Sequence, residues 1–187
     1  MGAARLGFVG NALGSLAVLI AVVFIAYGLP VVDHSLPAGR PVAAGAPFVV
    51  GAGVTVTPPV NATMDLSHTR PADDRGTALL MVNGVRLAIV VAPFHGSLDD
   101  AAARLRGKIT NNAGYQVTGA DRPVRTAMGV TGLRGAYNSP GRLGEYAVFV
   151  SDGLAVEVTA SGPENELRVL VPALDASLTS LSFRGGA

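Results

Sequence analysis

The sequence predicts an α+β domain, an antiparallel sheet packed by two helices, preceded by one N-terminal transmembrane helix. Three observations support this prediction. Two pairs of strand-like segments each flank a two-residue turn, two further segments have the apolar spacing of amphipathic helices, and 27 consecutive residues near the N-terminus carry no charge. A chain of 187 residues leaves room for one domain after such an apolar segment.

The uncharged run lies between Arg5 and Asp33. A helix needs about 20 apolar residues to cross a bilayer, whereas the core of a cleaved signal peptide has about 7 to 15. The length of the run therefore predicts a retained transmembrane helix over residues 1–32, and cleavage after the small residues of Ala26–Gly28 is the alternative. Arg5 and Arg40 balance each other across the run, so the free amino terminus favours a cytoplasmic N-terminus and an extracytoplasmic domain.

Gly10 and Gly14 are four residues apart within this run. Small residues at that spacing let two helices approach closely, so the pair predicts packing against another membrane helix. The alternative is that they reflect the general abundance of glycine, with 24 in the chain. Residues 33–46 are rich in Pro, Gly and Ala without periodicity, which predicts a tether. The folded domain is expected over residues 47–184.

The first half of the domain contains one hairpin and one helix. Val54 and Val56 alternate ahead of a Pro-Pro pair, which predicts a first strand, and the polar residues 60–76 are expected to form a loop. Asn83-Gly84 lies between two apolar runs and is typical of a type I′ turn. A helix is then expected to begin at Ser97, because Asp100 completes a capping box and an apolar stripe follows at Leu98, Ala102, Leu105 and Ile109.

The second half is expected to contain further strands, a second hairpin and a terminal helix. Residues 115–138 offer extended pieces broken by turn residues, and Asp152-Gly153 predicts a second hairpin. Pro163 suits the start of a second helix, and Pro172 falls away from its leucine stripe. That stripe consists of Leu167, Leu170, Val171, Leu174, Leu178 and Leu181.

This order of elements resembles the PsbP/Mog1-like domains, including the LpqN-type proteins of actinobacterial envelopes. The residues that carry the resemblance are "GVTVTPP", "FHGSLDDAAARLRGKI" and "GPENELRVLVPALDASLTSLSF". A single lysine, Lys108, among 14 basic residues is also typical of a high-GC bacterium such as an actinomycete. The resemblance implies an accessory, assembly or binding module, and it supplies no catalytic residues.

Composition argues against several classes of function. The chain has no cysteine, which excludes disulfides, thiolate metal sites and a lipidated cysteine. Charged residues make up 14% of the chain and the net charge is +1, so nucleic acid is not an expected partner. His34, His68 and His95 lack the spacing of metal ligands, and no serine-nucleophile motif occurs. We therefore expect no catalytic, metal or cofactor site.

The glycines at 129, 132, 135, 141 and 144 are expected to form turns.

Arg122, Arg125, Arg134 and Arg142 form a locally basic region in the sequence. They are candidates for a patch that meets anionic lipid headgroups or an acidic partner, and solvated strand edges are the alternative.

Together these features predict a single-pass, non-catalytic accessory or assembly subunit of a bacterial membrane or cell-envelope complex. Its expected partners are the lipid bilayer and other membrane proteins, which it would contact through the transmembrane helix and the soluble domain. The alternative is a module that binds an envelope lipid or glycolipid in an apolar cleft between sheet and helix. An uncharacterised hydrolase is the third possibility.

Overall fold

The computed structural model describes residues 39–183. The predicted transmembrane helix, with Gly10 and Gly14, lies outside the described residues, as does the first part of the predicted tether. Neither helix of the described part has the length and hydropathy that crossing a bilayer requires.

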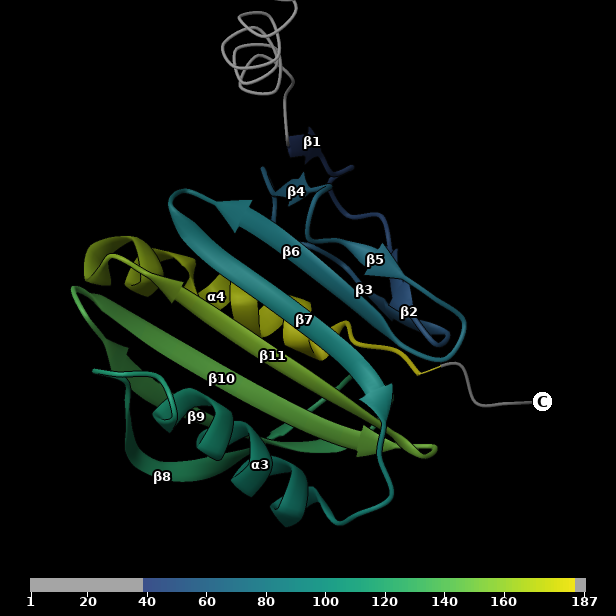
Figure 1. Cartoon of the computed structure of the whole chain (residues 1–187). Helices are drawn as coiled ribbons and strands as arrows, with labels where there is room; N and C mark the ends of the chain where they lie inside the picture. Colours follow the sequence, from purple (N-terminus) through teal and green to yellow (C-terminus); the bar gives the residue numbers. More distant parts are fainter. Residues whose placement is uncertain (1–38, 184–187) are drawn as a thin grey trace, which may run out of the picture. The chain divides into compact units, whose positions relative to one another are not determined.

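An antiparallel sheet forms the centre of the described fold (Figure 1). Its strands lie in the order β1-β4-β6-β7-β11-β10-β9-β8, and β5 pairs with β6 beside this path. In that spatial order the strands are β1 (Gly39–Pro41), β4 (Thr63–Asp65), β6 (Gly76–Val82), β7 (Val85–Pro93), β11 (Leu154–Gly162), β10 (Arg142–Ser151), β9 (Thr131–Ser139) and β8 (Gln116–Arg125). Strand β5 beside β6 comprises Arg70–Pro71. A separate two-stranded sheet consists of β2 (Phe48–Gly51) and β3 (Val54–Val56).

Both predicted hairpins are present. Asn83 and Gly84 have φ values of 47° and 77°, and Asp152 and Gly153 have 52° and 73°, the positive values that a type I′ turn needs at both central positions. The first turn joins β6 to β7, and the second joins β10 to β11. Alternate residues of β7 then share one buried face, as predicted: Val85, Leu87, Ile89 and Val91.

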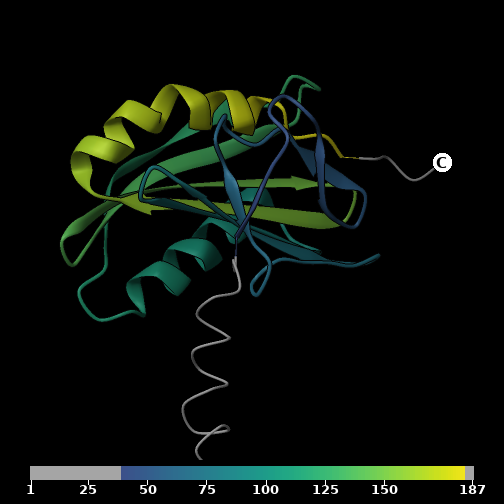
Figure 2. The same cartoon turned by 90° about the horizontal axis from the view of Figure 1, so that it is seen from above.

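The two predicted helices cover opposite faces of the sheet (Figure 2). Helix α3 (Leu98–Thr110) begins with the predicted capping box, in which the Ser97 hydroxyl accepts from the Asp100 amide and the Asp100 carboxylate accepts from the Ser97 amide. Helix α4 (Glu164–Thr179) continues through Pro172, which is exposed. The proline is tolerated on the solvent face because the buried leucine stripe still packs against the sheet.

The core is divided between these two faces. Apolar residues of α4, β6, β7 and β11 form the larger cluster, and α3 packs over Tyr137, Tyr146 and Val148 in the smaller one. Adjacent residues of β10 point to opposite faces, so Tyr146 and Val148 contact the α3 side while Ala147 and Phe149 contact the α4 side. The two helices therefore bury the two faces of the same strand.

Four expectations differ from the structure. The segment predicted as a first strand is the β2–β3 hairpin, which turns at Ala52 and Gly53 with φ values of 49° and 73°. The predicted loop 60–76 contains the short strands β4 and β5, and part of the predicted tether is β1, paired with β4. The fourth difference concerns glycines: Gly129 and Gly141 lie in turns as expected, whereas the glycines at 132, 135 and 144 lie inside strands.

Candidate functional site

Three glycines of β9 and β10 each lie beneath an aromatic ring of the neighbouring strand. Gly132 pairs with Phe149, Gly135 with Tyr146, and Gly144 with Tyr137. A Cβ atom at any of the three would overlap the facing ring, so only glycine lets the ring lie flat against the sheet. This arrangement fixes where each aromatic side chain reaches, and it places Tyr137 at one end of a groove.

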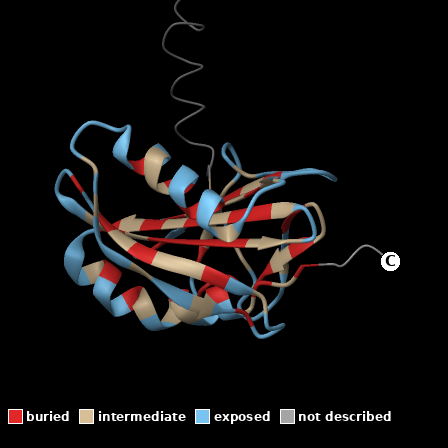
Figure 3. Ribbon diagram, turned by 90° about the horizontal axis from the view of Figure 1, so that it is seen from below, coloured by how far each residue is buried: buried red, intermediate tan, exposed pale blue. Residues whose placement is uncertain are grey.

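The groove lies between α3 and the sheet strands that α3 leaves uncovered. Buried residues alternate with intermediate or exposed ones along these strands, and Figure 3 shows this alternation in the strands between the two helices. Side chains of β7 and β11 form the floor, and the second half of α3 forms one wall. We call this hollow of about 250 Å³ the α3 groove; it is lined by Val90, Leu105, Lys108, Ile109, Asn112, Tyr115, Tyr137, Glu157 and Thr159.

A second hollow of about 330 Å³ lies on the β5 side of β7 and also uses Val90. Its lining includes Arg70 and Arg75 and the end of β7 at Ala92. Arg75 pairs with its neighbour Asp74, whereas Arg70 has no ion-pair partner in residues 39–183. Because the two hollows meet at Val90, β7 presents an open strip between α3 and β5.

An ion pair closes part of the α3 groove. The Lys108 ammonium lies 2.6 Å from Glu157 Oε2 and 2.8 Å from Oε1. Lys108 comes from α3 and Glu157 from β11, so the pair joins the wall to the floor. The carboxylate side chain is 11% exposed, and the lysine neutralises the charge that burial would otherwise leave unpaired.

Two tyrosines line the far end of the groove, and two arginines lie beside them. The rings of Tyr115 and Tyr137 stack with centroids 6.0 Å apart. Burial raises the pKa of the Tyr137 hydroxyl, so that group remains protonated, while the positive charges of Arg142 and Arg86 oppose the shift. The hydroxyl donates to the Ala160 carbonyl oxygen at 3.4 Å. The register pairs Arg86 with Ser161. These groups therefore surround one hydroxyl at one end of the sheet.

Arg142 is fixed at this end by backbone acceptors. Its Nη2 donates to the carbonyl oxygen of Gly84 at 2.9 Å and to that of Ser161 at 3.2 Å. Both acceptors are neutral, so they position the guanidinium without cancelling its charge. Sequence spacing could not have grouped Arg86 with Arg142, because 56 positions separate them and only the β7–β11–β10 order brings them together.

The structure does not bring the four arginines of the predicted basic region into one patch. Arg125 is aligned with Thr131 and Arg142 with Ser139, at opposite ends of β9 and roughly 26 Å apart at about 3.3 Å per residue. Arg122 is exposed and lies beside Arg134 on the α4 side.

The Arg134 side chain forms ion pairs inside the domain. It is only 15% exposed, and it forms ion pairs with Glu145, at 2.5 Å, and with Asp175 of α4. These bonds hold the pKa of Arg134 above its usual value even though burial acts in the opposite direction. Arg134 therefore attaches α4 to the sheet.

A second polar network attaches α3 to the edge of the sheet. Asp121, at the irregular part of β8, accepts from the buried Tyr146 hydroxyl and pairs with Arg106 of α3. Burial raises the pKa of Tyr146, which remains a donor to the carboxylate. This network fixes the wall of the groove against β8 and β10.

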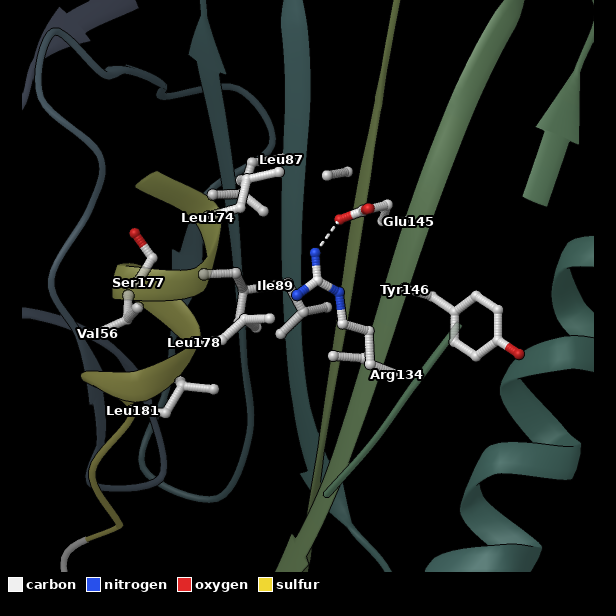
Figure 4. A pocket seen from close by; sticks show the side chains of 13 residues that line it. Val56, Leu87, Ile89, Arg134, Glu145, Tyr146, Leu174, Ser177, Leu178 and Leu181 are labelled. Carbon is white, nitrogen blue, oxygen red and sulfur yellow. Dashed lines mark hydrogen bonds and ion pairs between the residues drawn. The ribbon is translucent and has the colours of Figure 1, made fainter. Parts of the chain in front are cut away.

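The apolar space between the sheet and α4 is nearly filled. Figure 4 shows its cavity, with Leu174, Leu178 and Leu181 on one side and the Arg134–Glu145 pair at its edge. The cavity measures about 20 Å³, room for about one water molecule. The cleft between sheet and helix α4 therefore does not offer the space that the lipid-binding alternative requires.

The two described histidines do not line the α3 groove. His68 Nδ1 lies 3.0 Å from Asp65 Oδ2 on the surface, and His95 is exposed ahead of α3. Over residues 39–183 no three His, Cys, Asp or Glu side chains gather in a way that could hold a metal ion. His34 lies outside the described residues.

Comparisons with known proteins give structural similarity only. No family model and no curated protein matches the sequence. The solution structure of cyanobacterial PsbP (CyanoP) from Synechocystis sp. PCC 6803 matches with a TM-score of 0.52 at 12% identity, covering 76% of this chain and 98% of that one. LpqN, involved in cell envelope biogenesis of Mycobacterium tuberculosis, matches with a TM-score of 0.35 at 17% identity, over 77% of this chain and 89% of that one. The first match supports the predicted PsbP/Mog1-like fold, and the second TM-score is too low to add to it.

Proposed function

We propose that this chain is a single-pass, membrane-anchored accessory or assembly subunit of a bacterial cell-envelope complex, and that it is not an enzyme. The domain would lie outside the cytoplasmic membrane and receive a segment of a partner protein in the α3 groove. The observation that carries this proposal is the difference between the two faces of the sheet: α4 covers its face almost without a void, whereas α3 leaves β7 and β11 open on the other.

The side chains of the open face suit a protein contact. The open face of β7 and β11 carries small or branched residues, Ala88, Val90, Ala92 and Thr159, all of intermediate exposure. Such a surface lets a second chain approach the sheet closely, while Asn112 offers polar groups at the wall. A contact here would bury apolar strand surface that no described element covers.

The membrane anchor rests on the uncharged run before Asp33, which is long enough to cross a bilayer as a helix. Gly10 and Gly14 would then provide a second contact with the complex inside the membrane. Because the two contacts are on one chain, formation of one holds the other close to its partner, and the overall affinity exceeds that of either contact alone.

Co-purification tests this proposal. The full-length chain, tagged at its C-terminus, is extracted from its native membrane in mild detergent, and bound proteins are quantified by mass spectrometry. We expect a stoichiometric protein partner with the wild type and its loss with Val90→Arg, which places a long cation on the groove floor. Val169→Arg is the matched control, because Val169 is 78% exposed on α4, on the opposite face.

Thermal unfolding must first show that both variants fold like the wild type. Loss of the partner from both variants, or from neither, would contradict a groove contact. Recovery of bound lipid without any protein would support the lipid-binding alternative instead.

A further inference from the structure

We propose that Arg86 and Arg142, next to the end of the α3 groove at Tyr137, form a carboxylate-binding site, and that the partner segment entering the groove is acidic. This inference rests on the proposed function, since it names the chemistry of the partner at that groove. The Arg86–Arg142 site is defined here by these three residues and Ser161.

The first argument is charge. Over residues 39–183 neither Arg86 nor Arg142 lies within ion-pairing distance of a carboxylate, whereas the nearby Lys108 is paired with Glu157. Two guanidinium groups therefore lie near the Tyr137 end of the groove with no internal counter-charge. An anion placed there would interact with both, and like charges held together without one repel each other.

The second argument is preorganisation. Two carbonyl oxygens hold the Nη2 edge of Arg142, so its other N–H groups need not be ordered when an anion binds. The Tyr137 ring is held flat over Gly144 and stacks on Tyr115, and its hydroxyl donates its proton to the Ala160 carbonyl oxygen. A planar carboxylate can accept two parallel N–H bonds from a guanidinium such as that of Arg86, and the Nε and Nη1 groups of Arg142 can add a further single bond.

The third argument concerns the size of the hollow. At about 250 Å³ the α3 groove is smaller than the roughly 300 Å³ at which small-molecule pockets begin. A side chain or a short extended segment fits such a space. A phospholipid taken out of its membrane would also need an enclosure for its acyl chains, and the apolar cavity on the other face has room for about one water molecule. These volumes favour the carboxylate of a protein segment over an extracted lipid molecule.

Fluorescence anisotropy of labelled poly-L-glutamate with the full-length chain in detergent micelles tests the site. We expect binding by the wild type and about tenfold weaker binding by the double variant R86Q/R142Q, because charge-assisted hydrogen bonds are lost. The matched control is R122Q/R125Q, which removes the same two charges from exposed arginines on β8. It should bind within about twofold of the wild type, because the same net charge is lost at a distance from the groove.

Vesicles of phosphatidylglycerol provide the second arm, measured by flotation. Equal weakening of poly-L-glutamate binding by both double variants, or no binding by the wild type, would overturn the site. Vesicle binding that only R86Q/R142Q loses would overturn it in favour of a phosphate headgroup. If R142Q fails to fold, R86Q alone serves, since the exposed Arg86 makes no side-chain hydrogen bond within the described residues.

The inference and the proposed function fail in different ways. If R86Q/R142Q keeps a captured protein that Val90→Arg loses, the carboxylate site is wrong and the groove contact stands. If no protein is captured from membranes while poly-L-glutamate binding still depends on the two arginines, the site stands and the accessory role is wrong.

Discussion

Replacement of Gly144 by alanine should destabilise the domain through a single contact. The new Cβ would overlap three atoms of the Tyr137 ring, which is packed against that glycine. Non-bonded carbon atoms need about 3.5 Å between them, so the ring must move away from the sheet. Tyr137 is only 5% exposed and its ring stacks on Tyr115, so lifting the ring from the sheet disturbs that packing. Overpacking of this kind costs about 1 to 3 kcal/mol.

We therefore expect Gly144→Ala to lower the free energy of unfolding by about 2 kcal/mol, which corresponds to about 4 to 8 °C in Tm for a domain of this size. The assay is urea unfolding of the full-length chain in detergent, followed by far-ultraviolet circular dichroism. Gly107→Ala is the control. Gly107 lies in α3 with nothing within 4 Å of a Cβ, so alanine there should raise stability by up to about 1 kcal/mol.

A double-mutant cycle shows whether the ring is the cause. With Tyr137→Ala already in place, the space above Gly144 is open, and the same substitution should cost less than about 0.5 kcal/mol. The reasoning is refuted if Gly144→Ala unfolds like the wild type. It is also refuted if its cost is unchanged when the ring is absent.

Three further predictions follow from the polar networks. Asp121→Asn removes a charge that Arg106 and the buried Tyr146 hydroxyl share, so we expect a loss of about 2 kcal/mol in urea unfolding, and a change below about 0.5 kcal/mol would contradict it. Arg134→Met leaves Glu145 and Asp175 without their cation, so we expect the free energy of urea unfolding to fall by about 3 kcal/mol. An unchanged free energy would show that these ion pairs do not hold α4 to the sheet. The hydrogen bond from the Ser97 hydroxyl lowers the pKa of Asp100 below 3.8, so the ionised carboxylate stabilises the fold above pH 3.8, and this stability is lost as the pH falls through the folded pKa. Acid unfolding of Asp100→Asn should therefore depend less steeply on pH in this range than that of the wild type. An unchanged curve would refute the assignment.

The elements that the sequence predicted well are those fixed by neighbouring residues. Asn-Gly and Asp-Gly specify a tight turn from two residues, and a capping box specifies a helix start from four. The stripe of α4 was visible as far as Leu178, and Pro172 was placed correctly on the outer face. In each case the relevant interaction lies within about one helical turn or one hairpin.

The missed elements depend on partners far along the chain. Strands β1, β4 and β5 have two or three residues each, and pairing with the edge of the sheet is what makes them strands. Gly132, Gly135 and Gly144 have the local appearance of turn residues, and only the facing aromatics explain them. An aromatic residue and a glycine on two consecutive strands, at positions that a hairpin would align, is the signal that could have found them.

The same glycine pairs connect the stability of the fold to the chemistry of the groove. Because Gly144 lets the Tyr137 ring lie against the sheet, the hydroxyl reaches β11 and donates to the Ala160 carbonyl oxygen at 3.4 Å, beside Ser161. Arg142 begins the same strand as Gly144 and is held by the Ser161 carbonyl oxygen. A substitution that lifts the ring should therefore weaken anion binding as well as folding. A variant that lowered stability and left poly-L-glutamate affinity unchanged would show that Tyr137 serves the fold alone.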